Sequence, residues 1–126
     1  MATSAAIRKQ YQANTVNTSS PQQLLVMLYE RMYTDVCNAA NALAAKDFSK
    51  VNDMLCHAQD IIVELESALD VTAWDGGPGL ASLYVFLREE LVAANMNKDA
   101  KRIQTCKELL KPLAEAWRTA VESTER

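Results

Sequence analysis

The chain has 126 residues, of which 49% are hydrophobic and 23% are charged, and its formal net charge is −3. This length and composition are typical of a single folded domain and argue against a disordered chain. The mild charge, without a basic stripe of interleaved aromatic residues, argues against nucleic acid as a partner. No apolar run approaches the roughly 18–20 residues that cross a bilayer, and the N-terminus lacks the apolar core of a signal peptide. We therefore expect a cytoplasmic protein with no membrane insertion.

Residues 1–19 show little apolar periodicity, and we expect them to form a mobile or loosely docked N-terminal arm. The folded domain is then predicted to span residues 20–126. Its first helix begins with the motif S-P-Q-Q at residues 20–23, which combines a serine N-cap, a proline at the first helical position and a glutamine three residues after the cap. Apolar residues follow at steps of three and four from Leu25 to Leu43, as on one face of a helix.

Two further segments carry the same helical period. Asp47 is a predicted N-cap for a second helix, in which apolar residues from Phe48 to Leu69 alternate steps of three and four. Residues 71–79 contain W-D-G-G-P-G, which is incompatible with a helix interior and predicts a break. A third helix is predicted over residues 80–95.

A fourth helix completes the expected fold. A short turn at residues 95–98 is followed by Asp99, a predicted N-cap, and by an apolar stripe from Ile103 to Val121. Pro112 lies within this stripe and removes one backbone hydrogen bond, so we expect a kink there. Four amphipathic helices with short or moderate connections predict an all-α, antiparallel up-down-up-down four-helix bundle with an N-terminal arm.

The third predicted helix carries more apolar residues than one buried face needs. Residues 83–87 read L-Y-V-F-L, and five successive residues at about 100° each go right round a helix, so some of them must point away from the bundle centre. The second helix has a weaker surplus in Met54, Ile61 and Ala68. Such residues either pack beneath the arm or the W-D-G-G-P-G loop, or line a groove for a partner segment. Both hold if the arm covers the groove until a partner displaces it.

The sequence lacks the patterns of a cofactor or metal site. His57 is the only histidine, whereas a di-iron bundle needs paired Glu-x-x-His motifs and a His/Cys zinc site needs a cluster. No Ser-His-Asp or Cys-His pairing has a local signature, and no glycine-rich phosphate loop is present. The cysteines are odd in number, far apart and expected to be reduced core residues: Cys37, Cys56 and Cys106. We therefore expect no catalytic residue, no metal and no cofactor.

One alternative function uses a single histidine. Phosphotransfer domains of bacterial relays are helical bundles with a histidine on the second helix, where His57 also falls. Such domains typically place a lysine and a glycine shortly after the histidine, whereas residues 58–61 here read A-Q-D-I. A structural role for His57, on the flank of its helix, is therefore favoured.

A segment before and within the first helix resembles a family signature. Residues 11–29 read Y-Q-A-N-T-V-N-T-S-S-P-Q-Q-L-L-V-M-L-Y. This is similar to the pattern Y-x-x-N-x-V-x-T-A-S-P-x-x-L-x-x-M-L-Y of the FliS family of flagellar secretion chaperones. The resemblance extends from Tyr11 to Val121. Shorter likenesses to the family's second, third and fourth helices occur at residues 58–65, 83–84, 91–95 and 116–117.

The resemblance implies a four-helix bundle that binds the disordered C-terminal segment of flagellin. In the family, this binding prevents premature polymerisation of flagellin and supports its delivery to the flagellar type III export apparatus. The implied binding surface lies on the second and third helices, and its candidate residues are Ile61, Leu65, Ala68, Tyr84, Leu87 and Leu91. The N-terminal arm is implied to cover part of this surface in the free protein, through Tyr11, Asn14 and Val16.

Two alternatives stay open on the sequence alone. Leu65, Leu87 and Leu91 also fit the core stripes of their helices, so they have a structural interpretation beside the binding one. The same apolar face would also serve a helical adaptor or regulator that binds a folded partner. The chain departs from the family pattern in two places: the segment between its Gly-Gly pair and residues 83–84 is a few residues shorter, and Pro112 is atypical.

Overall fold

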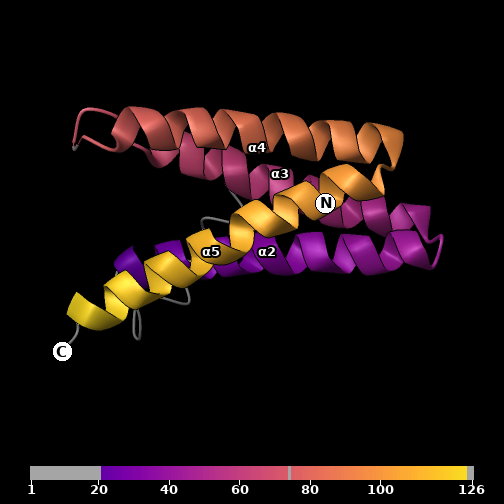
Figure 1. Cartoon of the computed structure of the whole chain (residues 1–126), viewed down its shortest axis with the longest axis horizontal. Coiled ribbons are helices and arrows are strands. Elements are labelled where there is room, and N and C mark those ends of the chain that lie inside the picture. The colour runs from indigo at the N-terminus through magenta and orange to yellow at the C-terminus, as the bar shows by residue number, and fades with distance from the viewer. Residues whose placement is uncertain (1–20, 74, 125–126) are drawn as a thin grey trace.

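The computed structural model describes residues 21–73 and 75–124, which form four helices. Successive helices run in opposite directions (Figure 1), and the predicted all-α up-down-up-down bundle is confirmed. The predicted arm, residues 1–19, and the predicted cap Ser20 lie outside the described residues. The helices are α2 (Pro21–Ala44), α3 (Phe48–Ala68), α4 (Gly77–Asn97) and α5 (Ala100–Thr124).

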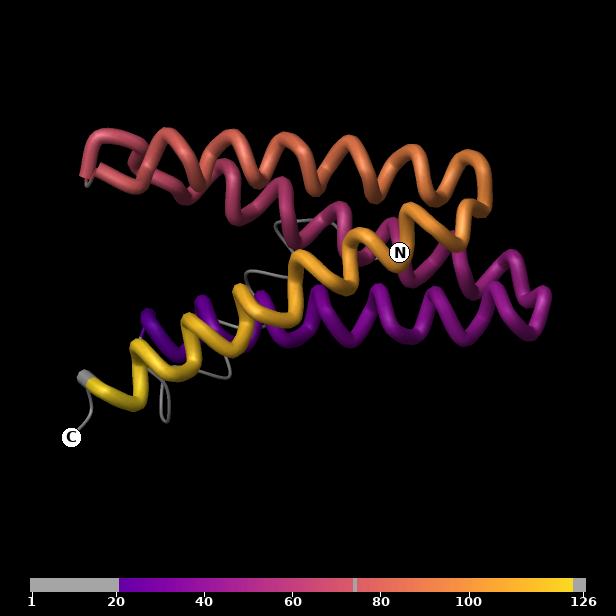
Figure 2. The backbone as a smooth tube through the Cα atoms, viewed as in Figure 1, coloured from indigo at the N-terminus to yellow at the C-terminus, as the bar shows by residue number. Residues whose placement is uncertain are grey.

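The helices do not form a uniform bundle. Within the described residues α2 and α4 each pack against both α3 and α5, so α2 and α4 lie on opposite sides. α4 and α5 lie close together at the turn that joins them and diverge toward their other ends, where α5 lies beside α2 (Figure 1, Figure 2). The bundle therefore has a closed end at the α4–α5 turn and an open end, where α4 begins and α5 finishes.

The core follows the predicted apolar stripes of the helices. Cys106 is buried in it as expected, whereas Cys37 and Cys56 are half-buried, and all three thiols are free. Phe48, the first residue of the second stripe, is instead 50% exposed, because it lies at the very start of its helix. The larger side chains with no exposed surface are Tyr29, Met32, Val36, Val51, Leu55, Ile61, Ile62, Leu87, Leu91 and Leu110.

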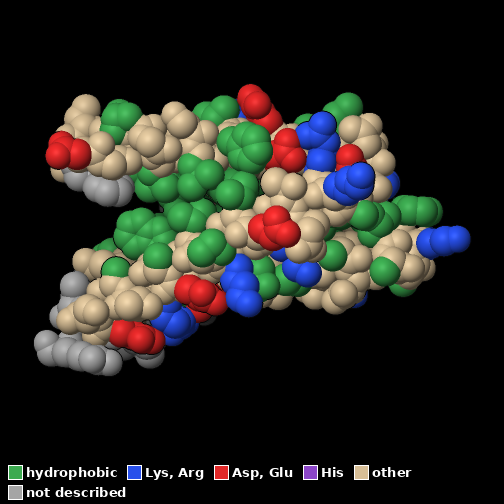
Figure 3. Space-filling model, in the orientation of Figure 1, with side chains coloured by type: hydrophobic (Ala, Val, Ile, Leu, Met, Phe, Trp, Pro, Cys, Tyr) green, Lys and Arg blue, Asp and Glu red, His purple; other side chains and the backbone are tan. Residues whose placement is uncertain are grey.

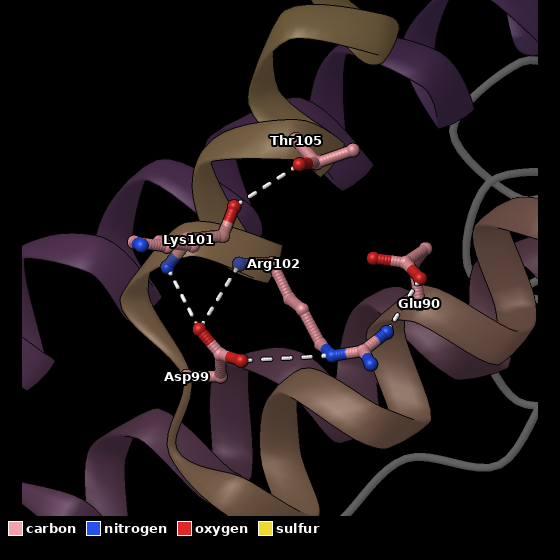
Figure 4. Close-up of polar contacts among 5 residues, drawn as sticks. All are labelled: Glu90, Asp99, Lys101, Arg102 and Thr105. Atoms are coloured by element: carbon pink, nitrogen blue, oxygen red, sulfur yellow. Dashed lines mark hydrogen bonds and ion pairs between the residues drawn. The ribbon is translucent and has the colours of Figure 1, made fainter.

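Both predicted aspartate caps are confirmed. The backbone N–H of Lys50 donates to Asp47 Oδ1 at 3.2 Å. Asp99 Oδ1 accepts from the backbone N–H of Lys101 at 2.9 Å and from that of Arg102 at 3.3 Å (Figure 4). These bonds satisfy donors that have no carbonyl partner within the first helical turn. Local sequence therefore decides where α3 and α5 begin.

The start of α4 corrects the break predicted at residues 71–79. The helix begins at Gly77, earlier than expected, because Pro78 lies in the first turn, where the helix does not need its backbone N–H. Gly77 is buried, and a Cβ atom there would lie 2.4 Å from the carbonyl oxygen of Val71. The missing side chain thus lets the first turn of α4 pack directly against the preceding loop.

The end of α4 also differs from the prediction. The turn predicted at residues 95–98 is wrong, since α4 continues to Asn97 and Lys98 ends it in the left-handed conformation with a φ of 49°. The backbone N–H of Lys98 then donates to the carbonyl oxygen of Ala94, in the last turn. α5 contains Pro112 and continues through it as a single helix.

A contact between ionisable side chains joins the helices of each packed pair within the described residues. Figure 4 shows the α4–α5 pair, in which Arg102 reaches from the first turn of α5 to Glu90. The pairs are Asp35–His57 between α2 and α3, Glu66–Arg88 at 2.7 Å between α3 and α4, Glu90–Arg102 at 2.6 Å between α4 and α5, and Glu30–Arg118 at 2.6 Å between α2 and α5.

The pair between α2 and α3 involves a fully buried carboxylate. His57 Nδ1–H donates to Asp35 Oδ2, and Arg31 Nε lies 3.3 Å from Asp35 Oδ1. Burial raises the pKa of the Asp35 carboxyl, and the hydrogen bond from His57 and the charges of His57 and Arg31 act in the opposite direction. His57 therefore contributes to helix packing, and one of its ring nitrogens is committed to Asp35.

Replacement of His57 by alanine should destabilise the bundle by about 2–4 kcal/mol, because it removes a partner of a buried carboxylate. Urea denaturation followed by circular dichroism at pH 7 measures this loss. The loss should shrink as the pH falls toward 4, since the raised pKa of Asp35 lets its carboxyl take up a proton in the folded state. The control is Arg118→Ala, which breaks an exposed pair and should cost no more than about 1 kcal/mol. Equal losses at pH 7 would contradict the importance of the Asp35–His57 contact.

Two neighbouring glycines provide a matched test of the start of α4. Gly77→Ala should lower the free energy of unfolding by about 1–3 kcal/mol, because its Cβ atom would overlap the Val71 carbonyl. A Cβ atom at Gly79 meets nothing within 4 Å, so Gly79→Ala should be neutral or stabilise by up to about 1 kcal/mol. Thermal melting compares the stability of the two variants. Equal stability would show that the close contact between residue 77 and the Val71 carbonyl does not affect the free energy of unfolding.

Candidate functional site

The open end of the bundle holds a pocket of about 210 Å³, which we call the open-end pocket. Figure 3 shows hydrophobic side chains gathered between α4 and α5, on the face where these helices diverge. The walls of the pocket come from all four helices and from the α3–α4 loop, so no single segment forms it. Its lining residues are Leu25, Leu65, Ala68, Leu69, Asp70, Ala73, Leu80, Tyr84 and Trp117.

Three aromatic side chains meet beside the open-end pocket. The ring of Tyr29 stacks on that of Trp117, with centroids 6.0 Å apart and an interplanar angle of 26°. Tyr29 also lies 6.3 Å from Tyr84, centroid to centroid, and the two hydroxyl groups hydrogen-bond to each other. Because Tyr29 belongs to α2 and Tyr84 to α4, this bond spans two helices that do not otherwise pack together. Burial raises the pKa of both phenols, so they stay protonated and keep the bond.

One charged residue lies among the residues that line the pocket. Asp70 follows the end of α3, and its Oδ1 accepts hydrogen bonds from the Thr72 hydroxyl at 2.7 Å and from the Thr72 backbone N–H at 3.0 Å. These bonds lower the pKa of Asp70, the hydroxyl having the larger effect. Asp70 therefore presents a fixed negative charge at the edge of an otherwise apolar pocket.

The structure divides the six candidate residues of the second and third helices into two groups. Leu65, Ala68 and Tyr84 line the open-end pocket. Of these, Ala68 is exposed, whereas Leu65 and Tyr84 are almost completely buried and also belong to the core. The other three have no exposed surface and support the pocket only through the core: Ile61, Leu87 and Leu91. The arm candidates lie outside the described residues: Tyr11, Asn14 and Val16.

The surplus of apolar residues on α4 is distributed as the helical period requires. Tyr84 and Leu87 point into the bundle, whereas Val85 and Phe86 are 38% and 45% exposed. The expectation that part of the L-Y-V-F-L segment faces away from the bundle centre is therefore confirmed. Further along α4, Val92 and Met96 are also exposed, and the exposed Glu89 lies between them and Val85, so the outer side of this helix alternates apolar and charged residues.

Three residues that line the pocket were not predicted as site residues: Leu25, Leu80 and Trp117. All three lie on apolar stripes that were attributed to the core. They differ from the core residues of the same stripes in their position along the helix. Each lies near the end of its apolar stripe that is at the open end of the bundle. Whether such a position is covered depends on the angle at which neighbouring helices cross.

The described reactive groups are engaged in packing. Cys106 lies in the core, where burial, and to a smaller extent the charge of Glu90, raises the pKa of its thiol to about 12.

Within residues 21–73 and 75–124, no group of three or more His, Cys, Asp and Glu residues is placed to hold a metal ion. None of the helices in this described part combines the length and apolar character needed to cross a membrane.

The tyrosine pair predicts a non-additive effect on stability. Tyr84→Phe should lower the free energy of unfolding by about 1–2 kcal/mol, because the buried Tyr29 hydroxyl loses its partner. The double variant Tyr29→Phe/Tyr84→Phe should recover part of this loss, since neither hydroxyl is then left buried and unpaired, while Trp117 loses its hydrogen bond to Tyr29. Chemical denaturation of the two single variants and the double variant measures the coupling. Strictly additive losses would contradict a direct bond between the hydroxyls.

Comparison with known proteins places the whole bundle in one family. The model of the family described as flagellar protein FliS matches residues 3–124. The flagellar secretion chaperone FliS of Bacillus subtilis (strain 168) is 29% identical over 116 residues, which cover 92% of this chain and 86% of that protein. The proteins of the same name from Salmonella typhimurium and Campylobacter jejuni are each 31% identical. Their alignments cover 83% and 86% of this chain and 79% and 85% of the respective relatives.

The family model spans every described helix, and the three alignments cover most of the length of each relative. The chain therefore belongs to the FliS family of flagellar proteins, which is a family of chaperones and not of enzymes.

Proposed function

We propose that this chain is a cytoplasmic export chaperone that binds the disordered C-terminal segment of flagellin at the open end of the bundle. The observation that carries the proposal is the open-end pocket, an apolar cavity beside an aromatic cluster, formed where α4 and α5 diverge. Three relatives named flagellar secretion chaperone support the functional class. A pocket that is already built on packed helices binds a segment without chemistry and with little reorganisation of the chaperone.

The proposed binding surface extends from the pocket along α4. A disordered segment that folds on binding usually buries roughly 1,000–3,000 Å², which is more than one pocket provides. Further area would come from exposed apolar side chains along α4, of which the first two follow the pocket residue Tyr84 and the last two lie toward the closed end: Val85, Phe86, Val92 and Met96. In this proposal the flagellin segment is anchored against Leu65, Ala68 and Tyr84 and continues over the exposed apolar part of α4.

Burial of the segment would account for both parts of the chaperone function. While the segment is bound, it is unavailable for contacts with other flagellin molecules, so premature polymerisation is prevented. Because the contacts are non-covalent, the segment is released when flagellin reaches the flagellar type III export apparatus. In the free protein, the N-terminal arm with Tyr11, Asn14 and Val16 is proposed to cover part of the surface until flagellin displaces it.

Calorimetric titration of the full chain with a synthetic peptide of the last few dozen residues of the cognate flagellin tests the proposal. We expect saturable one-to-one binding with a negative change in heat capacity, since apolar surface is removed from water. Absence of binding to the peptide would overturn the proposal. Binding of an intact folded partner, without binding of the peptide, would instead favour a helical adaptor that uses the same face.

A matched pair of variants locates the surface. Ala68 is exposed and lines the pocket, so Ala68→Trp should fill the pocket and weaken peptide binding by at least tenfold without removing a core contact. Ser67 is the exposed neighbour and does not line the pocket, so Ser67→Trp should bind the peptide like the unmodified protein. Circular dichroism checks that both variants keep the bundle. Equal affinity of the two variants would place the binding surface elsewhere.

A further inference from the structure

The open-end pocket has room for one large apolar side chain. A closed apolar cavity of roughly 150 Å³ holds a benzene molecule, and the volume here is about 210 Å³. A single leucine-sized or phenylalanine-sized side chain therefore fills it, and the rest of the bound segment must lie over the rim. The chemistry of the rim then decides which residues are accepted next to the anchored side chain.

The rim carries a charge that the bundle itself does not neutralise. Between helices, acidic side chains such as Glu30, Glu66 and Glu90 each have an arginine partner. Asp70 has no ion-pair partner among the described residues, and the bonds from Thr72 both go to Oδ1, so Oδ2 keeps its capacity to accept. The Thr72 bonds also hold the Asp70 carboxylate in one orientation within the loop that lines the pocket.

We propose that the pocket selects a segment in which the anchored apolar side chain is accompanied, within one helical turn, by a lysine or arginine that pairs with Asp70. This inference rests on the proposed function and adds the charge specificity of the bound segment. Because Asp70 is exposed, its pairing with a cation requires little desolvation. The ion pair with Asp70 therefore contributes mainly to specificity: it sets the register of the bound segment and disfavours acidic sequences. Its contribution to affinity is smaller.

The structure offers a conservative variant that removes only the charge. Asp70→Asn keeps an oxygen that can accept both hydrogen bonds from Thr72, so the turn after α3 is preserved. The matched control is Asp75→Asn, since Asp75 lies in the same loop, is also exposed and does not line the pocket. Both variants are titrated with the flagellin peptide at low and at high sodium chloride concentration.

We expect Asp70→Asn to weaken binding of the peptide by about two- to fivefold at low salt, as for an exposed ion pair, and to reduce the dependence of affinity on salt. Asp75→Asn should change neither quantity appreciably. Replacement of each basic residue of the peptide by glutamine, one at a time, then identifies the partner. One replacement should weaken binding to the unmodified protein by the same factor and have no further effect with Asp70→Asn.

Two negative outcomes are distinguishable. If the peptide binds the unmodified protein and Asp70→Asn alike, with the same salt dependence, the charge selection is overturned and the proposed function stands. If the peptide binds neither protein, the proposed function itself is overturned, and the charge selection with it.

Discussion

The divergence of α5 from α4 is the constraint on which the rest of the structure depends. The two helices share a tight turn at Lys98 and the Glu90–Arg102 pair (Figure 4). α5 then crosses to α2 (Figure 1), where Arg118 bonds Glu30. A helix that leaves its neighbour in this way cannot cover the far ends of the apolar stripes that it covers near the turn. The open-end pocket is therefore a consequence of helix direction, and no local motif encodes it.

The aromatic cluster compensates in part for the missing helix contact at the open end. Tyr29 and Tyr84 reach across the bundle from opposite helices and share a hydrogen bond, while Trp117 stacks on Tyr29 from α5. Large rings fill the widening space between diverging helices, and their polar atoms are satisfied by each other. The result is a closely packed group of rings beneath a pocket that stays accessible.

Charged contacts give the bundle its particular set of neighbours. Apolar stripes attract without direction, so on their own they allow several arrangements of four similar helices. Each packed pair of described helices also has a contact between ionisable side chains, from the buried Asp35–His57 hydrogen bond to the exposed Glu30–Arg118 ion pair. Exposed pairs add little stability. We interpret them as contacts that favour this arrangement over others, with Asp35–His57 the one whose loss has the largest cost.

The sequence by itself determined the helices, since helical period and capping are local properties. The stripes of α3 and α5 and the caps Asp47 and Asp99 could be predicted because each depends on residues within a few turns of one another. The early start of α4 was not predicted, although Pro78 in its first turn is a local signal for it. The need for glycine at position 77 could not be predicted, because it comes from the approach to the Val71 carbonyl, a contact made only once the loop has folded. Only the tertiary structure decided which half-buried residues form the pocket, among them Leu25, Leu80 and Trp117. Periodicity shows which side of a helix is apolar, but the crossing angle between helices determines which part of that side is left uncovered.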